Sequence, residues 1–370
     1  MTSAKKIAVI GAGIAGLSCA QRLQASGFNV TVFEKSRGAA GRMSTKRGEN
    51  EDGSAWQCDT GAQYFTARHP RFFAEVQRWI NAGVAAEWAP ELQVFGTLPD
   101  SLEVGASTSK PQRFVGTPRM TAPARLLADA LNLRSQTTIQ ALQKNEGQWR
   151  LHSAEHEWLA DTFDAVVVAV PAPQAQPLLL PIHADLAELA STAPMRGSWA
   201  LMLRYNEAMK LPFQAAFVNA DPLRWVAEDS HKPGRNGQSC WLLHASAEWS
   251  DAHIEATSEQ VGPLLISAFR SLGGREPAAW SRHPWRYADT AEPLNLGAVW
   301  DAQAGLGLCG DWLNGGKVEG AWLSGQLVAD KILAATYWSF ARTLNQATLV
   351  HYIDHAKGTN RGRFIPHLGI

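Results

Sequence analysis

The sequence predicts an α/β protein built from two interleaved parts, one on a parallel sheet and one on a mainly antiparallel sheet. Three observations support this fold class. Near the N-terminus, a short apolar strand runs into closely spaced glycines and then into a helix, as in parallel α/β units. The run Asp164–Pro171 is apolar enough for a strand buried on both faces of a parallel sheet. Between residues 199 and 244, several segments alternate apolar and polar side chains, as antiparallel strands with one buried face do.

The N-terminal element is the strand Ile7–Ile10, followed by the pattern G-x-G-x-x-G over Gly11–Gly16 and a helix over Leu17–Ala25. In this pattern the first glycine makes a tight turn, the second lets a pyrophosphate approach the backbone, and the third lets the helix pack on the strand. A second strand, Asn29–Phe33, leads into Glu34, at the distance where a carboxylate accepts the hydroxyls of an adenosine ribose. This agreement favours a dinucleotide site over a simple glycine-rich turn, but it does not distinguish NAD from FAD.

A second match to the same glycine pattern, Gly305–Gly310, does not predict a second site. No strand precedes it, and the acid that follows at the expected distance, Asp330, falls inside the helical pattern Val318–Ala334. A reductase with a separate NAD(P)H domain is therefore disfavoured.

Three further segments suit a flavin dinucleotide. After Lys35, a loop of small residues leads to Arg42, whose guanidinium can reach a diphosphate. The segment Asp59–Phe65 gives another approach lined by small residues and ends in an amide and aromatic rings. The strand at Leu306–Asp311 closes on Gly-Asp, and a helix starts near Val318. The acid can hold a ribityl hydroxyl, and the N-terminus of the helix can stabilise negative charge on a reduced ring.

In these motifs the chain resembles the flavin-containing amine oxidase superfamily. Within that superfamily it is more similar to the renalase family, through Gly41–Thr45, Gly61–Thr66, Leu242–Ser246 and Trp285–Tyr287. The resemblance extends in outline over residues 5–334 and implies FAD as the cofactor. It implies that the following residues bind FAD: Gly11, Ala12, Gly13, Ala15, Gly16, Glu34, Lys35, Arg42, Gly61, Ala62, Ile139, Gly310, Asp311 and Val318.

Two departures from the amine oxidases are informative. Covalent members attach the ring through a cysteine before the C-terminal motif, but residues 280–308 contain none, so we expect non-covalent FAD. Amine oxidases also place an aromatic residue just before the C-terminal helix, where this chain has Lys317. A cation there would repel a protonated amine and suit an anionic reduced ring, unless Lys317 is simply a solvated loop residue.

The resemblance implies that the substrates are dihydro isomers of NAD(P) with hydride on the wrong ring carbon, oxidised to NAD(P)+ while O2 becomes hydrogen peroxide. The expected catalytic residues are His244, Lys317 and Tyr64, and the expected substrate-binding residues are Gln63, Trp225, Trp285 and Tyr287. His244 is otherwise a core histidine, and the tryptophans are otherwise core residues. Two alternatives stay open: a FAD-dependent amine oxidase of small amines, and a flavin-binding protein without turnover.

Composition limits the partners. With 34 Lys and Arg against 34 Asp and Glu, the chain lacks the basic excess expected for nucleic acid as its main partner. No apolar run reaches the ~18 residues that a membrane span needs. Lys5 and Lys6 before an apolar stretch resemble a signal peptide, but the glycine motif explains that stretch better. The 4 cysteines form no C-x-x-C, so we expect reduced thiols in the cytoplasm and no metal site. The oligomeric state is not predicted.

The central strands are expected at Trp199–Tyr205, Ala215–Val218, Leu223–Ala227 and Cys240–His244, with helices over Arg71–Asn81 and Ser258–Leu272. We therefore expect a FAD-binding domain made of residues 1–67, 111–172 and 290–335, and a substrate domain made of residues 68–110 and 173–289. Residues 336–370 would form a C-terminal tail, with a basic stretch over 358–363 that is either a docking segment or disordered.

Overall fold

The computed structural model describes residues 4–50, 53–96, 111–235 and 239–336. The chain divides into two units, Met1–Ala329 and Asp330–Ile370. In the second unit, residues 330–336 are helical. The rest of the expected C-terminal tail, including its basic stretch, lies outside the described residues.

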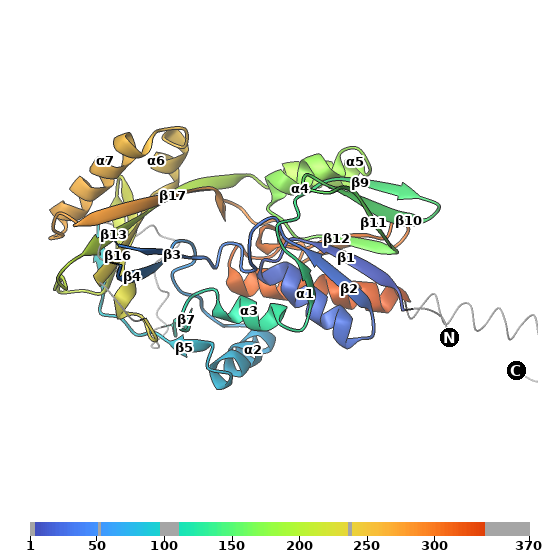
Figure 1. Ribbon diagram of the computed structural model, residues 1–370, viewed down its shortest axis with the longest axis horizontal. Coiled ribbons are helices and arrows are strands. Elements are labelled where there is room, and N and C mark those ends of the chain that lie inside the picture. Colours follow the sequence, from blue (N-terminus) through green and yellow to red (C-terminus); the bar gives the residue numbers. More distant parts are fainter. Residues whose placement is uncertain (1–3, 51–52, 97–110, 236–238, 337–370) are drawn as a thin grey trace, which may run out of the picture. The chain divides into compact units, whose positions relative to one another are not determined.

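The first unit contains a six-stranded sheet in the order β18-β19-β12-β1-β2-β8. Strand β1 pairs in parallel with both β2 and β12, and only β18 runs antiparallel to its neighbour. Figure 1 shows helix α1, Ile14–Ala25, against this sheet. The strands are β1 Lys6–Ile10, β2 Asn29–Phe33, β8 Asn132–Arg134, β12 Ala165–Val168, β18 Val299–Asp301 and β19 Leu306–Leu308.

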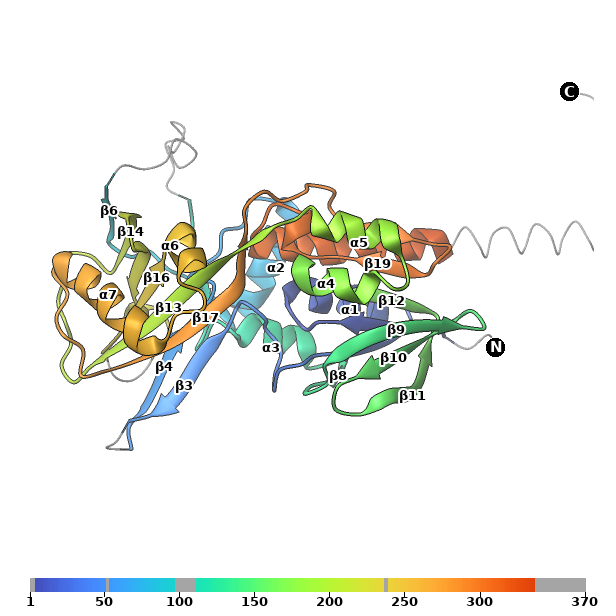
Figure 2. The ribbon, with the colours of Figure 1, turned by 90° about the horizontal axis from the view of Figure 1, so that it is seen from above.

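A second six-stranded sheet has the order β17-β13-β16-β15-β14-β6. It is antiparallel except for the pairing of β14 with β6. Helices α6, Ala247–Ala252, and α7, Ser258–Ser271, cover one face, as Figure 2 shows. The strands are β6 Leu92–Phe95, β13 Met195–Tyr205, β14 Ala215–Ala220, β15 Leu223–Glu228, β16 Ser239–Ala245 and β17 Ala279–Thr290.

Smaller sheets and helices lie outside the two six-stranded sheets. A three-stranded sheet consists of β9 Ile139–Asn145, β10 Gln148–Ser153 and β11 Glu157–Phe163. Two strand pairs are β3 Thr45–Glu49 with β4 Ala55–Asp59, and β5 Ala85–Glu87 with β7 Phe114–Gly116. Further helices are α2 Pro70–Asn81, α3 Ala122–Ala128, α4 Ala172–Leu179, α5 Ala184–Ser191, and the 3-10 turns η2 Asp229–His231 and η3 Asp311–Leu313. A further helix begins at residue 318.

Apolar side chains from both sheets form separate cores. One core lies between the parallel sheet, β9–β11 and α4–α5, and includes Phe33, Val166 and Leu308. The other lies between the antiparallel sheet and α7, and includes Trp241 and Phe269. Trp241 is fully buried, so it belongs to this core.

The sheet arrangement confirms the predicted fold class, and β2 spans the predicted residues. Helix α1 starts three residues earlier than expected because Gly13 acts as its N-cap. The rejected match Gly305–Gly310 contains β19 within it, which agrees with the rejection. The expectation that no strand precedes it was wrong, because β18 lies just before it and pairs antiparallel with β19. The parallel sheet takes strands from residues 6–33, 132–168 and 299–308, and the antiparallel sheet from 92–95, 195–245 and 279–290. The exact domain boundaries stay a prediction.

Candidate functional site

The glycines after β1 form a loop with one open position. Gly11 has φ +105°, and a Cβ on it would lie 2.6 Å from the carbonyl oxygen of Ala169. A Cβ on Gly16 would lie 2.0 Å from the carbonyl oxygen of Gly11, so this glycine lets α1 pack against the turn. A Cβ on Gly13 would meet no atom within 4 Å. The backbone is therefore open to a ligand at Gly13, where the pattern predicts a pyrophosphate.

Glu34 is held beside this loop. Its carboxylate accepts hydrogen bonds from the backbone N–H groups of Ala12, at 2.9 Å, and of Ser36, at 2.8 Å. The side chain is buried, whereas Lys35 is exposed. The structure thus fixes an acid next to the open backbone, as a ribose contact requires.

The loop that carries Arg42 packs on the glycine loop. Ala40 donates its N–H to the Ala12 carbonyl at 3.0 Å. Gly41 has φ +53°, and a Cβ on it would lie 3.3 Å from Gly13 Cα, which is a tight contact. Arg42 donates Nη1 to Asp311 Oδ2 at 2.9 Å and Nη2 to Oδ1 at 2.5 Å. This bidentate pair joins the segments predicted for the diphosphate and for the ribityl chain, although they lie far apart in the sequence.

The segment after β4 also packs on Arg42. Ala62 donates its N–H to the Arg42 carbonyl at 2.9 Å, and a Cβ on Gly61 would lie 2.0 Å from that oxygen. Near the C-terminal motif, Gly310 donates its N–H to Ser324 Oγ at 3.0 Å, and Val318 is the first residue of the following helix.

Ile139, at the start of β9, is buried in the core that contains Phe33. The expected FAD-binding residues thus provide an open backbone at Gly13, the fixed carboxylate of Glu34 and the guanidinium of Arg42. These groups fit FAD.

Two side chains from the antiparallel sheet converge on the Thr60 carbonyl oxygen. His244 Nε2 lies 2.9 Å from it and Trp285 Nε1 lies 2.8 Å from it. Because a carbonyl oxygen only accepts, the His244 proton must be on Nε2. Burial lowers the pKa of His244 to about 4, with Lys232 and Arg224 adding to the effect against the opposing hydrogen bond. We call Thr60, His244 and Trp285 the Thr60 clamp, and its imidazole is neutral near pH 7.

An aromatic wall consists of Tyr64, Trp88, Phe217 and Trp225. The ring centroids of Tyr64 and Trp225 are 5.5 Å apart, and those of Trp225 and Phe217 are 4.9 Å apart. The Arg113 guanidinium carbon lies 5.2 Å from the Tyr64 centroid. Trp225 is only 5% exposed, and its indole N–H has no hydrogen-bond partner among the described residues. The structure therefore brings the predicted residues Tyr64 and Trp225 together.

The other predicted substrate residues have different surroundings. Lys317 is exposed after two glycines with positive φ, and no side chain in the described ranges pairs with it. Tyr287 is half-buried in β17, two positions after Trp285, in the stretch where the pairing of β17 with β13 shifts register. Gln63 is buried; its amide group donates to the Asp59 carbonyl at 2.7 Å, and its amide oxygen accepts from Lys232 at 3.1 Å. A substrate contact by Gln63 would have to replace these bonds.

The sequence did not indicate a buried ion cluster formed by Asp59, Asp229, Lys232 and Arg235. Lys232 Nζ lies 3.1 Å from Asp59 Oδ2 and 2.7 Å from Asp229 Oδ1, and Arg235 Nη2 lies 2.5 Å from Asp59 Oδ2. Burial opposes ionisation of Asp59, but Lys232 and Arg235 lower its pKa to about 2. Burial and the neighbouring Asp59 raise the pKa of Asp229. The only local signal was the spacing of Asp229 and Lys232, which says nothing about Asp59, 173 residues from Lys232.

Within the described ranges, no helix has both the length and the apolar stretch that crossing a membrane requires.

Two family models match the chain. One is described as an NAD(P)-binding Rossmann-like domain and matches residues 9–79, and the other is described as flavin containing amine oxidoreductase and matches residues 82–333. Among curated proteins, the mitochondrial protoporphyrinogen oxidase of Nicotiana tabacum is 46% identical over 65 residues, and an L-amino-acid oxidase of Notechis scutatus scutatus is 42% identical over 65 residues. Each of these matches spans 18% of this chain and only 12% of the relative.

Solved structures share the fold over most of the chain. A candidate protoporphyrinogen oxidase from Exiguobacterium sp. 255-15 has a TM-score of 0.69 at 12% identity, over 90% of this chain and 99% of that one. Wild-type putrescine oxidase bound to putrescine has a TM-score of 0.62 at 13% identity, over 89% of this chain and 99% of that one.

Proposed function

This chain belongs to the family of flavin-containing amine oxidoreductases, and we propose that within this family it is a non-covalent FAD oxidase of the renalase type. Its substrates are the isomers of dihydro-NAD and dihydro-NADP that carry hydride on the wrong carbon of the nicotinamide ring. The dihydropyridine gives up a hydride and becomes the aromatic pyridinium. Molecular oxygen takes up that hydride and one solvent proton to become hydrogen peroxide.

FAD, when bound, supplies the two-electron acceptor between donor and oxygen. In this proposal Gly11–Gly16 receive the diphosphate and Glu34 the adenosine ribose. Arg42 lies near the phosphates, and Asp311 holds the ribityl chain. The bidentate contact between Arg42 and Asp311 keeps both side chains in place beside each other.

The substrate side needs orientation rather than a base, because a dihydropyridine releases hydride without losing a proton. The Thr60 clamp fixes Trp285 and a neutral His244 against one backbone oxygen. Trp225 pairs with His244 across β15 and β16, and its ring centroid lies 5.5 Å from that of Tyr64. Flat aromatic surfaces suit a nicotinamide ring, and fixed positions lower the entropy cost of aligning it. Lys317 is assigned to stabilising negative charge on the reduced cofactor.

The observation that carries the proposal is the positive charge at the aromatic wall. One ring of the wall, Tyr64, has the Arg113 guanidinium over it, at 5.2 Å from the centroid. Lys232 lies 5.6 Å from the centroid of a second ring, Trp88, but Asp59 and Asp229 balance its charge together with that of Arg235. A protonated amine would be repelled by Arg113, whereas a dinucleotide with its phosphates would be attracted. The wall therefore favours dihydronicotinamide dinucleotides over amines.

The test is anaerobic reduction of the purified, FAD-loaded protein. We expect the flavin absorbance to bleach with the dihydro-NAD isomers made by borohydride reduction of NAD+. Ordinary NADH, with hydride at the usual ring carbon, serves as the matched control and should bleach it much more slowly. Admission of air should restore the colour and release one hydrogen peroxide for each isomer oxidised, measured by a coupled peroxidase.

Other results would assign the protein differently. Bleaching by putrescine or other small amines, and not by the isomers, would establish the amine oxidase alternative. Bleaching by protoporphyrinogen alone would place the activity with that of the tobacco relative. A flavin that none of these donors reduces would indicate binding without turnover.

Location and domain division also stay proposals. We propose the cytoplasm, where the buried thiols Cys19, Cys58, Cys240 and Cys309 would remain reduced. We further propose that the parallel sheet belongs to the FAD-binding domain and the antiparallel sheet to the substrate domain, with the interleaved boundaries given above.

A further inference from the structure

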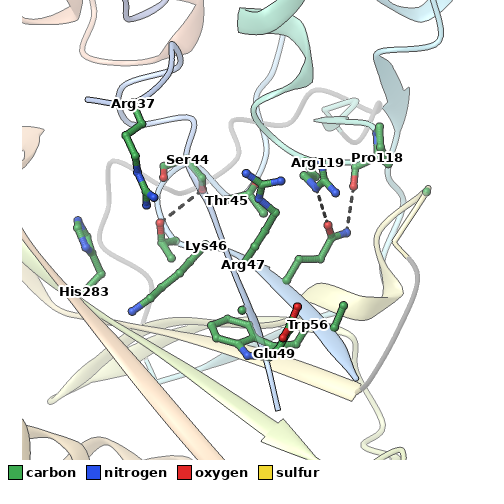
Figure 3. Close-up of a pocket in the computed structure, with 15 residues that line it drawn as sticks. Arg37, Ser44, Thr45, Lys46, Arg47, Glu49, Trp56, Pro118, Arg119 and His283 are labelled. Atoms are coloured by element: carbon green, nitrogen blue, oxygen red, sulfur yellow. Dashed lines mark hydrogen bonds between the residues drawn. The ribbon is translucent and has the colours of Figure 1, made fainter. Parts of the chain in front are cut away.

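A cavity of ≈1060 Å³ opens beside the β3–β4 hairpin. Figure 3 shows the side chains that line it, among them Arg37, Lys46, Arg47 and Arg119. The lining contains a single carboxylate, that of Glu49. We call this space the basic cavity, and its volume is at the upper end of the ~300–1,000 Å³ usual for small-molecule sites.

The four cations have no carboxylate partner among the residues that the structure describes. Lys46 donates to the Arg282 carbonyl at 3.3 Å, and Arg119 donates Nε to Gln57 Oε1 at 2.9 Å. Both acceptors are neutral. Within the described ranges, the side chains of Arg37 and Arg47 form no hydrogen bond or ion pair. This differs from the surface arginines Arg270 and Arg286, each of which pairs with a glutamate.

Positive charges nearby also act on two of these cations. Burial and the positive charges of Arg204 and Arg282 lower the pKa of Lys46. Burial and the charges of Arg47, Arg125 and Arg235 lower the pKa of Arg119. An anion in the basic cavity would relieve this repulsion, so the cavity favours an anionic ligand.

The basic cavity adjoins the Thr60 clamp. Thr60 itself lines the cavity, together with Ser44, whose carbonyl accepts the Thr60 N–H at 2.9 Å. On the other side, His283 lines the cavity, and its ring centroid lies 4.3 Å from that of Trp285. A ligand with one end at the clamp therefore has the cavity next to it.

We propose that the basic cavity binds the adenosine-diphosphate half of the dinucleotide substrate while the nicotinamide lies at the Thr60 clamp. This inference rests on the proposed function. The diphosphate meets Arg47 and Arg119, and the fork of each guanidinium can contact two phosphate oxygens. Glu49, the one carboxylate of the lining, lies on the same strand as Arg47, two positions along.

The test measures binding of ADP-ribose, which lacks the nicotinamide, to the FAD-loaded protein by isothermal titration calorimetry. Loading with FAD keeps ADP-ribose from the dinucleotide loop. We expect Arg47→Ser and Arg119→Ser each to weaken ADP-ribose binding at least about tenfold, the loss typical of one charge-assisted hydrogen bond. Arg47→Lys, which keeps the charge, should weaken it less. Arg270→Ser, on α7 and away from the cavity, is the matched control and should bind ADP-ribose as the unaltered protein does.

Kinetics with two substrates provide the second readout. Dihydro isomers of nicotinamide riboside lack the diphosphate and the adenosine, so Arg119→Ser should raise KM for the dinucleotide isomers and leave KM for the riboside isomers unchanged. A KM increase for both would mean that the substitution acts on the whole site and would overturn the inference.

The remaining outcomes separate the inference from the proposed function. If ADP-ribose binds and the arginine variants lose it while no dihydro isomer bleaches the flavin, the proposed function fails and the cavity is still a nucleotide site. If the isomers bleach the flavin but ADP-ribose does not bind, the function stands and the inference is wrong. If inorganic pyrophosphate binds as tightly as ADP-ribose, the cavity holds a simple anion, and the assignment to the adenosine half is wrong.

Discussion

His244 in β16 and Trp285 in β17 donate hydrogen bonds to the same carbonyl oxygen, that of Thr60, at 2.9 Å and 2.8 Å. These strands are not neighbours, because β13 lies between them in the sheet. Thr60 follows β4 and precedes Gly61, which packs on the Arg42 carbonyl. The clamp therefore ties the predicted cofactor segment to two strands of the antiparallel sheet, while burial keeps His244 neutral.

The neutral histidine predicts a pH dependence of stability. The pKa of His244 is lowered to about 4, whereas an unfolded chain binds the proton near 6.5. Between these pH values the unfolded state binds the proton and the folded state does not. The contribution of His244 to the free energy of unfolding is therefore fully present above pH 6.5 and is lost as the pH falls toward 4. After discounting for the partly exposed ring, we expect about 2 kcal/mol between pH 7 and pH 4.5.

Urea unfolding at the two pH values measures this effect. His244→Gln, which can still donate to Thr60, should show a smaller loss on acidification. His156→Gln changes an exposed histidine and should leave the loss as it is. An equal loss in His244→Gln and in the unaltered protein would mean that other groups cause it.

The glycine loop predicts different effects for substitutions at two of its glycines. Gly13→Ala adds a methyl group into open space at ordinary φ, so the cofactor-free protein should lose about 1 kcal/mol or less. Its FAD affinity should fall sharply, because the methyl occupies the approach of the diphosphate. Gly16→Ala forces a methyl to within 2.0 Å of the Gly11 carbonyl oxygen and should cost about 3 kcal/mol or more. Chemical unfolding without FAD, followed by FAD titration of each folded variant, checks both.

The pair between Arg42 and Asp311 predicts that the shape of the cation matters for FAD affinity. Arg42→Lys keeps the charge but loses the two-pronged contact with Asp311. We expect FAD affinity to fall about tenfold in Arg42→Lys and further in Arg42→Ala. Arg78→Ala, whose arginine pairs with Glu75 on α2, is the control. The measurement is the flavin retained per protein after dialysis, and equal retention in all variants would contradict this role.

The local parts of this site were predictable because short-range geometry dictates them. A strand, three glycines and a helix specify which backbone stays open, and Glu34 follows directly from the end of β2. The roles of the tryptophans were harder to predict from the sequence, because both a buried core and a binding surface favour this side chain. The structure places Trp241 in the core and the half-buried Trp285 at the Thr60 clamp, a difference that depends on how strands pair.

Contacts between distant segments were not predictable. The clamp joins residues separated by 184 and 225 positions, and the Arg42–Asp311 pair joins residues 269 positions apart. No periodicity in the sequence encodes such distances. The basic cavity was missed for the same reason: Arg119 meets Arg47 only after β3, β4 and the segment before α3 have come together.

Lys317 predicts a change in reduction rate without a change in FAD binding. If its ammonium stabilises negative charge on the reduced cofactor, Lys317→Met should slow bleaching by the dihydro isomers about tenfold or more. The side chain is exposed, so folding and FAD content should stay normal. Stopped-flow absorbance measures the rate, with Lys210→Met, another exposed lysine, as the control. An unchanged rate in Lys317→Met would identify it as a solvated loop residue.

The buried ion cluster predicts a large loss of stability when one cation is removed. Lys232 has a fully buried side chain between Asp59 and Asp229, so Lys232→Met leaves both carboxylates with less compensation. Removing one partner of a buried pair typically costs about 3–5 kcal/mol, because the remaining charge stays desolvated. The carboxyl that then protonates should be Asp229, whose pKa is already raised by burial and by Asp59.

The double variant Lys232→Met with Asp229→Asn should therefore recover part of the loss, since it removes the costlier carboxylate and leaves Asp59 paired with Arg235. Urea unfolding at pH 7 of the two single variants and the double variant closes this cycle. Additive losses would mean that Lys232 and Asp229 act independently. If the double variant is more stable than Lys232→Met alone, opposing charges rather than packing hold the cluster together. The amide oxygen of Gln63 is then part of this charge cluster, as an acceptor for Lys232, rather than a ligand contact.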